Sequence, residues 1–123
     1  MAMLYTGVKW GDPMGLQNAI DKLSPVSEQS LYILLSLYKN DNHGYGVVIT
    51  TRDMTNGRLE LNPTTVYKAI YRFIEYGLVE CSEESDGKKY YKISNDGKEF
   101  LNHEYQKIKL LEHNICITIG EEQ

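Results

Sequence analysis

The hydrophobic periodicity of this chain changes at Gly77, and this change constrains the fold more than any other feature. Up to Gly77, apolar residues recur at the three- and four-residue spacing of amphipathic helices. Beyond it, two short β-prone runs flank Asp86-Gly87, a dipeptide that favours a tight hairpin turn. The pattern becomes helical again after Ser94, so the sequence predicts helices, one β-hairpin and a final helix.

Two of the expected helices begin with a capping residue followed by proline, which suits the first helical position. Ser24-Pro25 predicts a core helix that reaches Tyr38, and Asn62-Pro63 predicts a helix that ends at Gly77. The buried side of the second of these helices is expected to consist of Val66, Ile70, Phe73 and Ile74, with Ala69 beside them.

Another helix is expected between these two. It should be weaker than they are, because its β-branched residues lose side-chain freedom in a helix. It starts at about Tyr45 and ends at Asn56-Gly57, and a short strand follows it. One side of this helix is expected to carry Tyr45, Val48, Ile49 and Arg52.

The last helix is expected to be capped by Ser94 and to run to about His113. It carries a broken apolar stripe that the preceding helices cover only in part, so we expect this stripe to face a second copy of the chain. The tail over residues 115–119 is apolar and β-prone, and it is expected to be buried because such segments aggregate when exposed. The dimerisation stripe consists of Phe100, Leu101, Tyr105, Ile108 and Leu111.

The 123 residues suffice for one domain, which divides into three parts. Residues 1–23 form an N-terminal arm, either loosely ordered or with a short helix over residues 16–23, and the place of Trp10 in it is open. Residues 24–97 form a winged helix-turn-helix, and residues 98–119 form a dimerisation helix with its tail. The expected fold class is mainly α with a small β-hairpin wing.

Composition excludes several classes of protein. No apolar run approaches the roughly 20 residues that span a bilayer, and the N-terminus does not resemble a secretory signal, so we expect a cytoplasmic protein without a membrane partner. Cys81 and Cys116 are expected to be free, buried thiols of a reducing compartment. Metal-ligand spacing, phosphate-binding loops and nucleophile–base pairs do not occur, so no metal, cofactor or enzymatic activity is expected.

The net charge of −4 argues mildly against nucleic acid as a partner, so the placement of the cations decides the question. In a winged helix-turn-helix, the third helix enters the major groove of DNA. Here that is the helix that starts at Asn62-Pro63. With the apolar side of that helix turned inward, its outward positions are Thr64, Thr65, Lys68 and Arg72, and Tyr67 lies between the two sides. Lys88 and Lys89 stand at the hairpin tip, where the nearby acids Glu83, Glu84 and Asp86 weaken the case for DNA contact.

Four segments resemble, in order and spacing, the motifs of PadR-type repressors. Residues 43–46 (HGYG) match the HGY motif of that family, and residues 61–67 (LNPTTVY) are similar to its L-S-P-x-[ST]-[LV]-Y. Residues 77–80 (GLVE) look like its G-L-[IV], and residues 87–97 (GKKYYKISNDG) look like its G-x-x-R-K-Y-Y-x-[IL]-T-x-x-G. The resemblance covers residues 30–101.

This resemblance implies a homodimeric repressor that binds double-stranded DNA. It implies that Thr64, Thr65 and Lys68 face bases or phosphates, that the wing lysines contact the backbone, and that a small aromatic or drug-like ligand is a possible effector. The wing departs from the family pattern, because lysine stands where arginine is common and gives no bidentate geometry. The single short C-terminal helix resembles the small subfamily, without a large effector domain.

Three alternatives stay open at this point. The winged helix could serve as a protein–protein adaptor without DNA binding, which the negative charge favours. The tyrosines at 45, 67, 90 and 91 could form a ligand box, although buried tyrosines with bonded hydroxyls are the commoner outcome. His43, a catalytic candidate only in isolation, is expected to cap or pack at a helix start.

Overall fold

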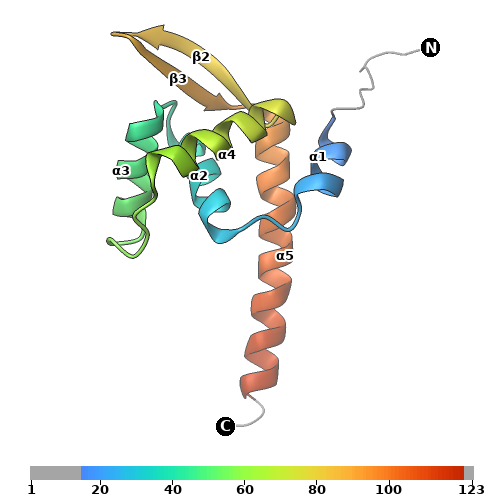
Figure 1. Ribbon diagram of the computed structural model, residues 1–123. Coiled ribbons are helices and arrows are strands. Elements are labelled where there is room, and N and C mark those ends of the chain that lie inside the picture. The colour runs from blue at the N-terminus through green and yellow to red at the C-terminus, as the bar shows by residue number, and fades with distance from the viewer. Residues whose placement is uncertain (1–14, 121–123) are drawn as a thin grey trace, which may run out of the picture.

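Five helices and one two-stranded antiparallel hairpin make up residues 15–120, the part of the chain that this computed structural model describes (Figure 1). The predicted fold class, mainly α with a hairpin wing, is confirmed. The earlier part of the expected N-terminal arm, including Trp10, lies outside the described residues. In chain order the elements are α1 (Leu16–Leu23), α2 (Glu28–Lys39), α3 (Gly44–Met54), α4 (Pro63–Glu75), β2 (Val79–Ser85), β3 (Lys88–Ile93) and α5 (Asn95–Gly120).

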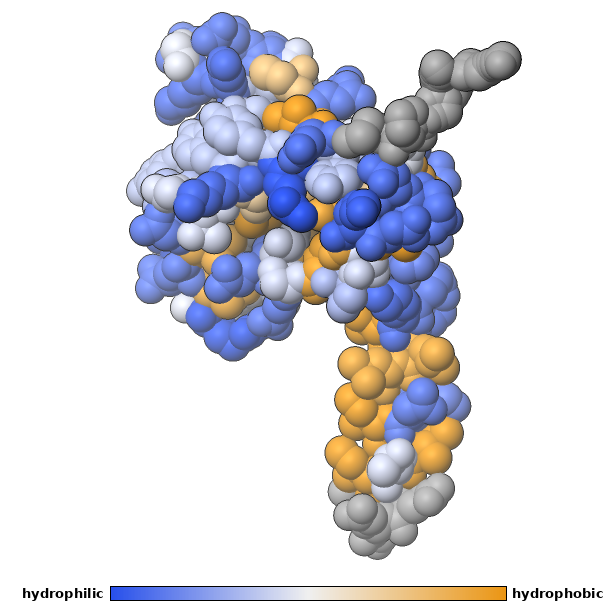
Figure 2. Space-filling model, turned by 45° about the vertical axis from the view of Figure 1, so that its right-hand side comes forward, coloured by the Kyte–Doolittle hydropathy of each residue, from blue (hydrophilic) through white to orange (hydrophobic). Residues whose placement is uncertain are grey.

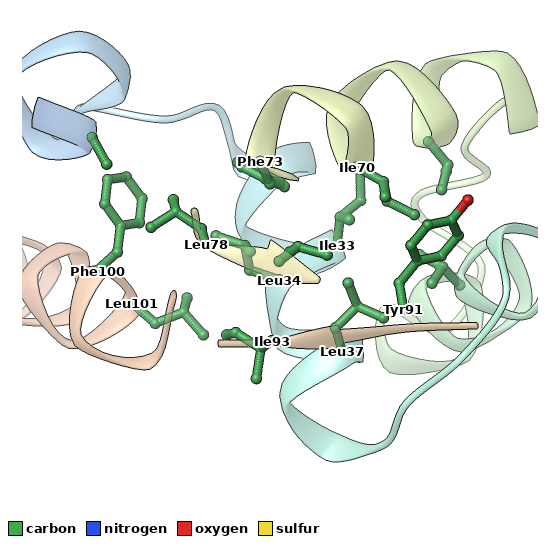
Figure 3. Close-up of a cluster of buried hydrophobic side chains, with 14 of the residues drawn as sticks. Ile33, Leu34, Leu37, Ile70, Phe73, Leu78, Tyr91, Ile93, Phe100 and Leu101 are labelled. Atoms are coloured by element: carbon green, nitrogen blue, oxygen red, sulfur yellow. The ribbon is translucent and has the colours of Figure 1, made fainter. Parts of the chain in front are cut away.

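Helix α2 forms the centre of the core. Ile33, Leu34 and Leu37 are almost fully buried, and they lie between side chains of α4, the hairpin base and α5 (Figure 3). Each such side chain contributes about 1.5–3 kcal/mol by leaving water, so α2 anchors the elements around it. The residues that surround α2 in this cluster include Ile70, Phe73, Leu78, Tyr91, Ile93, Phe100 and Leu101.

The two cap-and-proline helix starts have different outcomes. Asn62 caps α4 as predicted, because its side chain accepts a hydrogen bond from the Thr64 N–H at 2.7 Å and Pro63 is the first helical residue. The prediction for Ser24-Pro25 is wrong. Helix α2 begins at Glu28, and Ser27 caps it by accepting from the Ser30 N–H, while the Ser24 hydroxyl bonds to Glu104.

The predicted weaker helix exists as α3. Gly44, Val47 and Thr51 are buried, whereas Tyr45 and Arg52 are exposed. The buried residues are small, and α3 approaches the Tyr67 ring closely at Gly44. No strand lies between α3 and α4 in the described chain. Instead, the Leu59 N–H bonds to the Thr55 hydroxyl at 3.0 Å.

The hairpin turn is confirmed at Asp86-Gly87. Both residues have positive φ, 52° and 75°, which is the left-handed backbone that a tight hairpin turn requires. Strands β2 and β3 pair in antiparallel register, with an irregularity between Cys81 and Glu83. Burial is concentrated at the base of the hairpin, so the tip projects from the body (Figure 1).

Ser94 caps α5 as predicted, because its hydroxyl accepts from the Gly97 N–H and donates to the Gly77 carbonyl. The predicted β-prone, buried tail is wrong. Helix α5 continues without a break through residues 115–119, and the isoleucines in that segment are exposed. None of the helices within residues 15–120 is both long and apolar enough to cross a membrane.

Two further predictions about burial need correction. Phe100 is fully buried and Leu101 is 9% exposed, because the first turns of α5 pack into the core of their own chain. These two residues are therefore not available as the start of a dimerisation stripe. Cys81 and Cys116 are free, as predicted, but both are exposed rather than buried.

A buried carboxylate fastens the segment between α1 and α2 to α5. Glu104 is 3% exposed, and it accepts hydrogen bonds from the Ser24 hydroxyl at 2.6 Å and the Val26 N–H at 3.3 Å. His103 Nδ1 lies 3.0 Å from the same carboxylate, and Lys107 Nζ lies 3.6 Å away. Burial opposes ionisation, but these bonds and the lysine charge outweigh it and lower the pKa of Glu104.

We expect Glu104→Gln to destabilise the protein at neutral pH by about 1–3 kcal/mol, because buried donors then lose a charged acceptor. Since the pKa of Glu104 is lowered in the folded state, this contribution is present above the ordinary glutamate pKa and is lost as pH falls through the folded value. Urea unfolding of wild type and variant at equal protein concentration, at about pH 7 and about pH 3.5, measures the difference.

The exposed Glu99 on the same helix provides the control, and Glu99→Gln should change stability little at either pH. A difference between wild type and Glu104→Gln that stays constant or grows on acidification would contradict an ionised Glu104.

Candidate nucleic-acid interface

Helix α4 divides into a buried side and a solvent-facing side. Val66, Ile70 and Phe73 are buried as predicted, whereas Ile74 is 37% exposed and only borders the core. All four of the predicted outward residues are exposed: Thr64, Thr65, Lys68 and Arg72. The structure therefore brings two hydroxyls and two cations to one helix face.

The cations on this face are not neutralised by acids. Within residues 15–120, neither Lys68 nor Arg72 forms an ion pair, and the Arg72 guanidinium lies 5.5 Å from the centre of the Tyr76 ring. At the start of the helix, Thr64 and Thr65 stand beside the positive end of the helix dipole, which attracts phosphate. This face can accept a polyanion without first breaking an ion pair.

The hairpin presents its two tip lysines differently. Lys88 and Lys89 are exposed, as predicted, but Lys89 stands opposite Glu84 in the strand register. Closer to the base, Lys92 Nζ lies 4.0 Å from Glu80. A cross-strand acid offsets much of the attraction between a lysine and phosphate, so the hairpin is electrostatically weaker than α4.

The hairpin is fastened to the start of α3. Asn42 and Tyr91 exchange two backbone hydrogen bonds, of 3.0 and 2.8 Å, although Asn42 lies outside the strands. The rings of His43 and Tyr90 meet edge to face with centres 5.3 Å apart. These contacts fix the direction in which the wing points.

His43 is confirmed as a helix cap. Its Nδ1 accepts a hydrogen bond from the Gly46 N–H at 3.1 Å, which requires that nitrogen to be unprotonated. Burial and the nearby charge of Lys88 lower the pKa of His43, and both therefore favour the neutral imidazole that the cap needs. The histidine thus has a structural role at the junction of wing and helix.

Tyr67 joins α4 to α3 through Gly44. A side chain added at Gly44 would overlap the Tyr67 ring and its hydroxyl, so glycine is required for this close approach. The structure therefore places Tyr67, predicted as a phosphate contact, against the start of α3. The centres of the Tyr67 and Tyr71 rings lie 6.1 Å apart, and Tyr71 stands one turn further along the same side of α4.

Tyr71 extends this connection to the hairpin. Burial first, and then a hydrogen bond with Tyr71, raise the pKa of Tyr91 to about 12. Tyr67 and Tyr91 thus serve as packing between elements, rather than as an open ligand box.

The sequence did not reveal the roles of Asn42 and Tyr71 in joining the hairpin to α3 and α4. Gly44 in the HGY segment was the clue in the sequence, because a glycine at the start of a helix indicates that another element approaches closely there.

Comparison with known proteins places these features in a family. The sequence matches the model of the "Transcriptional regulator PadR-like family" over residues 33–103. It is 27% identical over 88 residues to "Transcriptional regulator YqjI" of Escherichia coli, in an alignment that spans 72% of this chain and 42% of that protein. The chain therefore covers less than half the length of this curated relative.

Solved structures have the same fold. The crystal structure of a PadR family transcription regulator from Clostridium difficile is 25% identical with a TM-score of 0.62, and the match covers 76% of this chain and all of that one. A transcriptional regulator from Clostridium thermocellum gives a TM-score of 0.64 at 21% identity, over 80% of this chain and 94% of the other.

Substitution of Gly44 tests the α3–α4 contact. We expect Gly44→Ala to cost about 1–3 kcal/mol, because the added methyl group forces the Tyr67 ring to move. In a Tyr67→Leu background the same change should be neutral or stabilising, since alanine otherwise favours a helix by about 0.5–1 kcal/mol over glycine. Urea unfolding of the four proteins forms the double-mutant cycle. Equal costs in both backgrounds would refute the contact.

Proposed function

The chain belongs to the PadR-like family of transcriptional regulators, and on that premise we propose that it is a repressor that binds an inverted-repeat operator as a homodimer. The family consists of transcriptional regulators rather than enzymes. The observation that carries the proposal is the face of α4, where two hydroxyls and two cations are exposed together and neither cation forms an ion pair within residues 15–120. A helix of this kind fits the major groove of B-DNA.

The residues on this face have different roles in the proposal. Thr64 and Thr65, at the start of the helix, reach base edges or nearby phosphates with their hydroxyls. Lys68 stands at the middle of the face, where it binds guanine or a phosphate, and Arg72 binds the backbone towards the end of the helix. Tyr67 positions the helix, and the wing lysines Lys88 and Lys89 make weaker backbone contacts.

The homodimer is supported by the distal half of α5. With 26 residues the helix is about 39 Å long, and its far half extends from the body as an apolar surface (Figure 2). The exposed residues with helical spacing on one side are Tyr105, Ile108, Leu111, Ile115 and Ile119. Exposed apolar surface of this extent marks an interaction site, and a second copy of α5 would cover it.

An effector site is supported by a groove between α2 and α5. The groove has a volume of about 320 Å³, and Leu31, Leu35, Tyr38 and Tyr105 line it together with the cation Lys98. Ile108 lies both in this groove and in the apolar side of α5. A small aromatic ligand bound here would therefore contact the proposed dimer interface, and through it could change the spacing of the two reading helices and relieve repression.

DNA binding is tested on the region upstream of the chain's own gene. We expect Lys68→Ala to weaken binding about tenfold with the fold retained, and the Thr64/Thr65/Lys68/Arg72 quadruple alanine variant to lose operator preference, because both remove contacts in the groove. Fluorescence anisotropy over a range of salt concentrations measures both effects. Lys39→Ala, an exposed lysine at the end of α2, is the control.

Unchanged binding by the quadruple variant would overturn the assignment of α4 as the reading helix. Negligible affinity of the wild type, even at low salt, would favour the protein–protein adaptor instead, because phosphate binding strengthens steeply as salt is reduced.

The dimer is tested by placing a charge on the apolar side of α5. We expect wild type at micromolar concentration to sediment at twice the 14.1 kDa of one chain, and Ile115→Lys to sediment near 14.1 kDa, because a buried lysine would lack a partner. His113→Lys, on another side of α5, should remain dimeric. A monomeric wild type would contradict the proposed dimer.

A further inference from the structure

We infer that the protein holds a DNA phosphate at the flank of the reading helix, in a hollow that Lys22 of α1 and Arg72 of α4 line together. This inference rests on the proposed DNA binding and adds a contact to it. It gives α1 a role in DNA binding, which the function proposed above does not assign to that helix.

The hollow lies between α1, the segment that leads to α2, and α4. It has a volume of about 180 Å³, and Pro25, Val26, Ala69 and Phe73 supply its apolar walls. Its polar groups are Lys22, Arg72 and the hydroxyls of Ser27 and Ser30. Two cations and two hydroxyls around an apolar floor suit a single phosphate group, which takes both ionic and hydrogen-bonded contacts.

Two of the acids near this hollow are paired with cations. Glu28 forms two hydrogen bonds with Arg58, at 3.2 and 2.9 Å. Glu104 is held by Ser24 and Lys107, and Asp21 accepts a hydrogen bond from Gln17 at 2.9 Å. The Gln17 amide is neutral, so Asp21 remains an acid next to Lys22 in the chain. Within the described residues, however, neither Lys22 nor Arg72 forms an ion pair, so both cations are available to an anion.

The position beside α4 identifies the anion as part of the DNA backbone. A helix in the major groove lies between two phosphate backbones, so each of its flanks faces one of them. Arg72 belongs both to the exposed face of α4 and to the lining of the hollow, which therefore continues the DNA-facing surface towards α1. Phosphate contacts of this kind fix the position of a protein on DNA and do not read sequence.

Lys22→Gln tests the inference, because it removes the one cation of the hollow that is not on the reading helix. The probe is a labelled duplex of about 40 base pairs from the upstream region, long enough to extend past two half-sites. We expect affinity at low salt to fall about three- to tenfold, and the slope of log K against log salt to decrease by about 0.9, as for one lost phosphate contact. A scrambled duplex should show the same loss, because the contact ignores sequence.

Lys39→Gln is the matched control, because it removes the same charge at the far end of α2, about 16 Å along that helix from the end that borders the hollow. The inference is overturned if Lys22→Gln and Lys39→Gln behave alike while Lys68→Ala still weakens binding, and in that case the proposed DNA binding stands. A Lys22→Gln loss seen on the operator but absent on the scrambled duplex would also overturn it. If the wild type binds no duplex at low salt, both the proposed function and this contact are wrong.

Discussion

The contact between Gly44 and Tyr67 determines how α3, α4 and the hairpin are arranged. Helix α3 has few large buried side chains, so apolar burial alone would hold it weakly against α4. Glycine instead lets the two helices approach until the tyrosine ring covers the start of α3. Because Asn42 and His43 lie just before this point and contact β3, the same close contact relates α4, α3 and the hairpin to one another.

At the other end of the molecule, the buried carboxylate of Glu104, rather than close packing at a glycine, holds the elements together. Glu104 fastens the segment after α1 to α5, and the same segment lines the hollow beside α4. Packed elements therefore connect α5 to the flank of α4. The core around Phe100 provides a second packed connection between α5 and α4.

Local chemistry made much of this predictable from the sequence. Asn62-Pro63 and Asp86-Gly87 each specify a backbone geometry by themselves, and both were placed correctly. Ser24-Pro25 carries the same pattern as Asn62-Pro63, yet its serine bonds to a residue 80 positions away, which no local pattern shows. Likewise, the burial of Phe100 depends on where α5 crosses the core, and the helical state of residues 115–119 overrides their β propensity.

Net charge was the least informative sequence property, because charges act over a short range. At physiological salt an exposed charge is largely screened beyond about 8 Å, so a phosphate responds to its immediate neighbours and not to a total of −4. On α4 those neighbours are cations without acidic partners, whereas on the wing Glu84 stands opposite Lys89. In the function that we propose, a wing that attracts phosphate weakly limits binding to arbitrary DNA and leaves discrimination between sequences to α4, which can reach base edges.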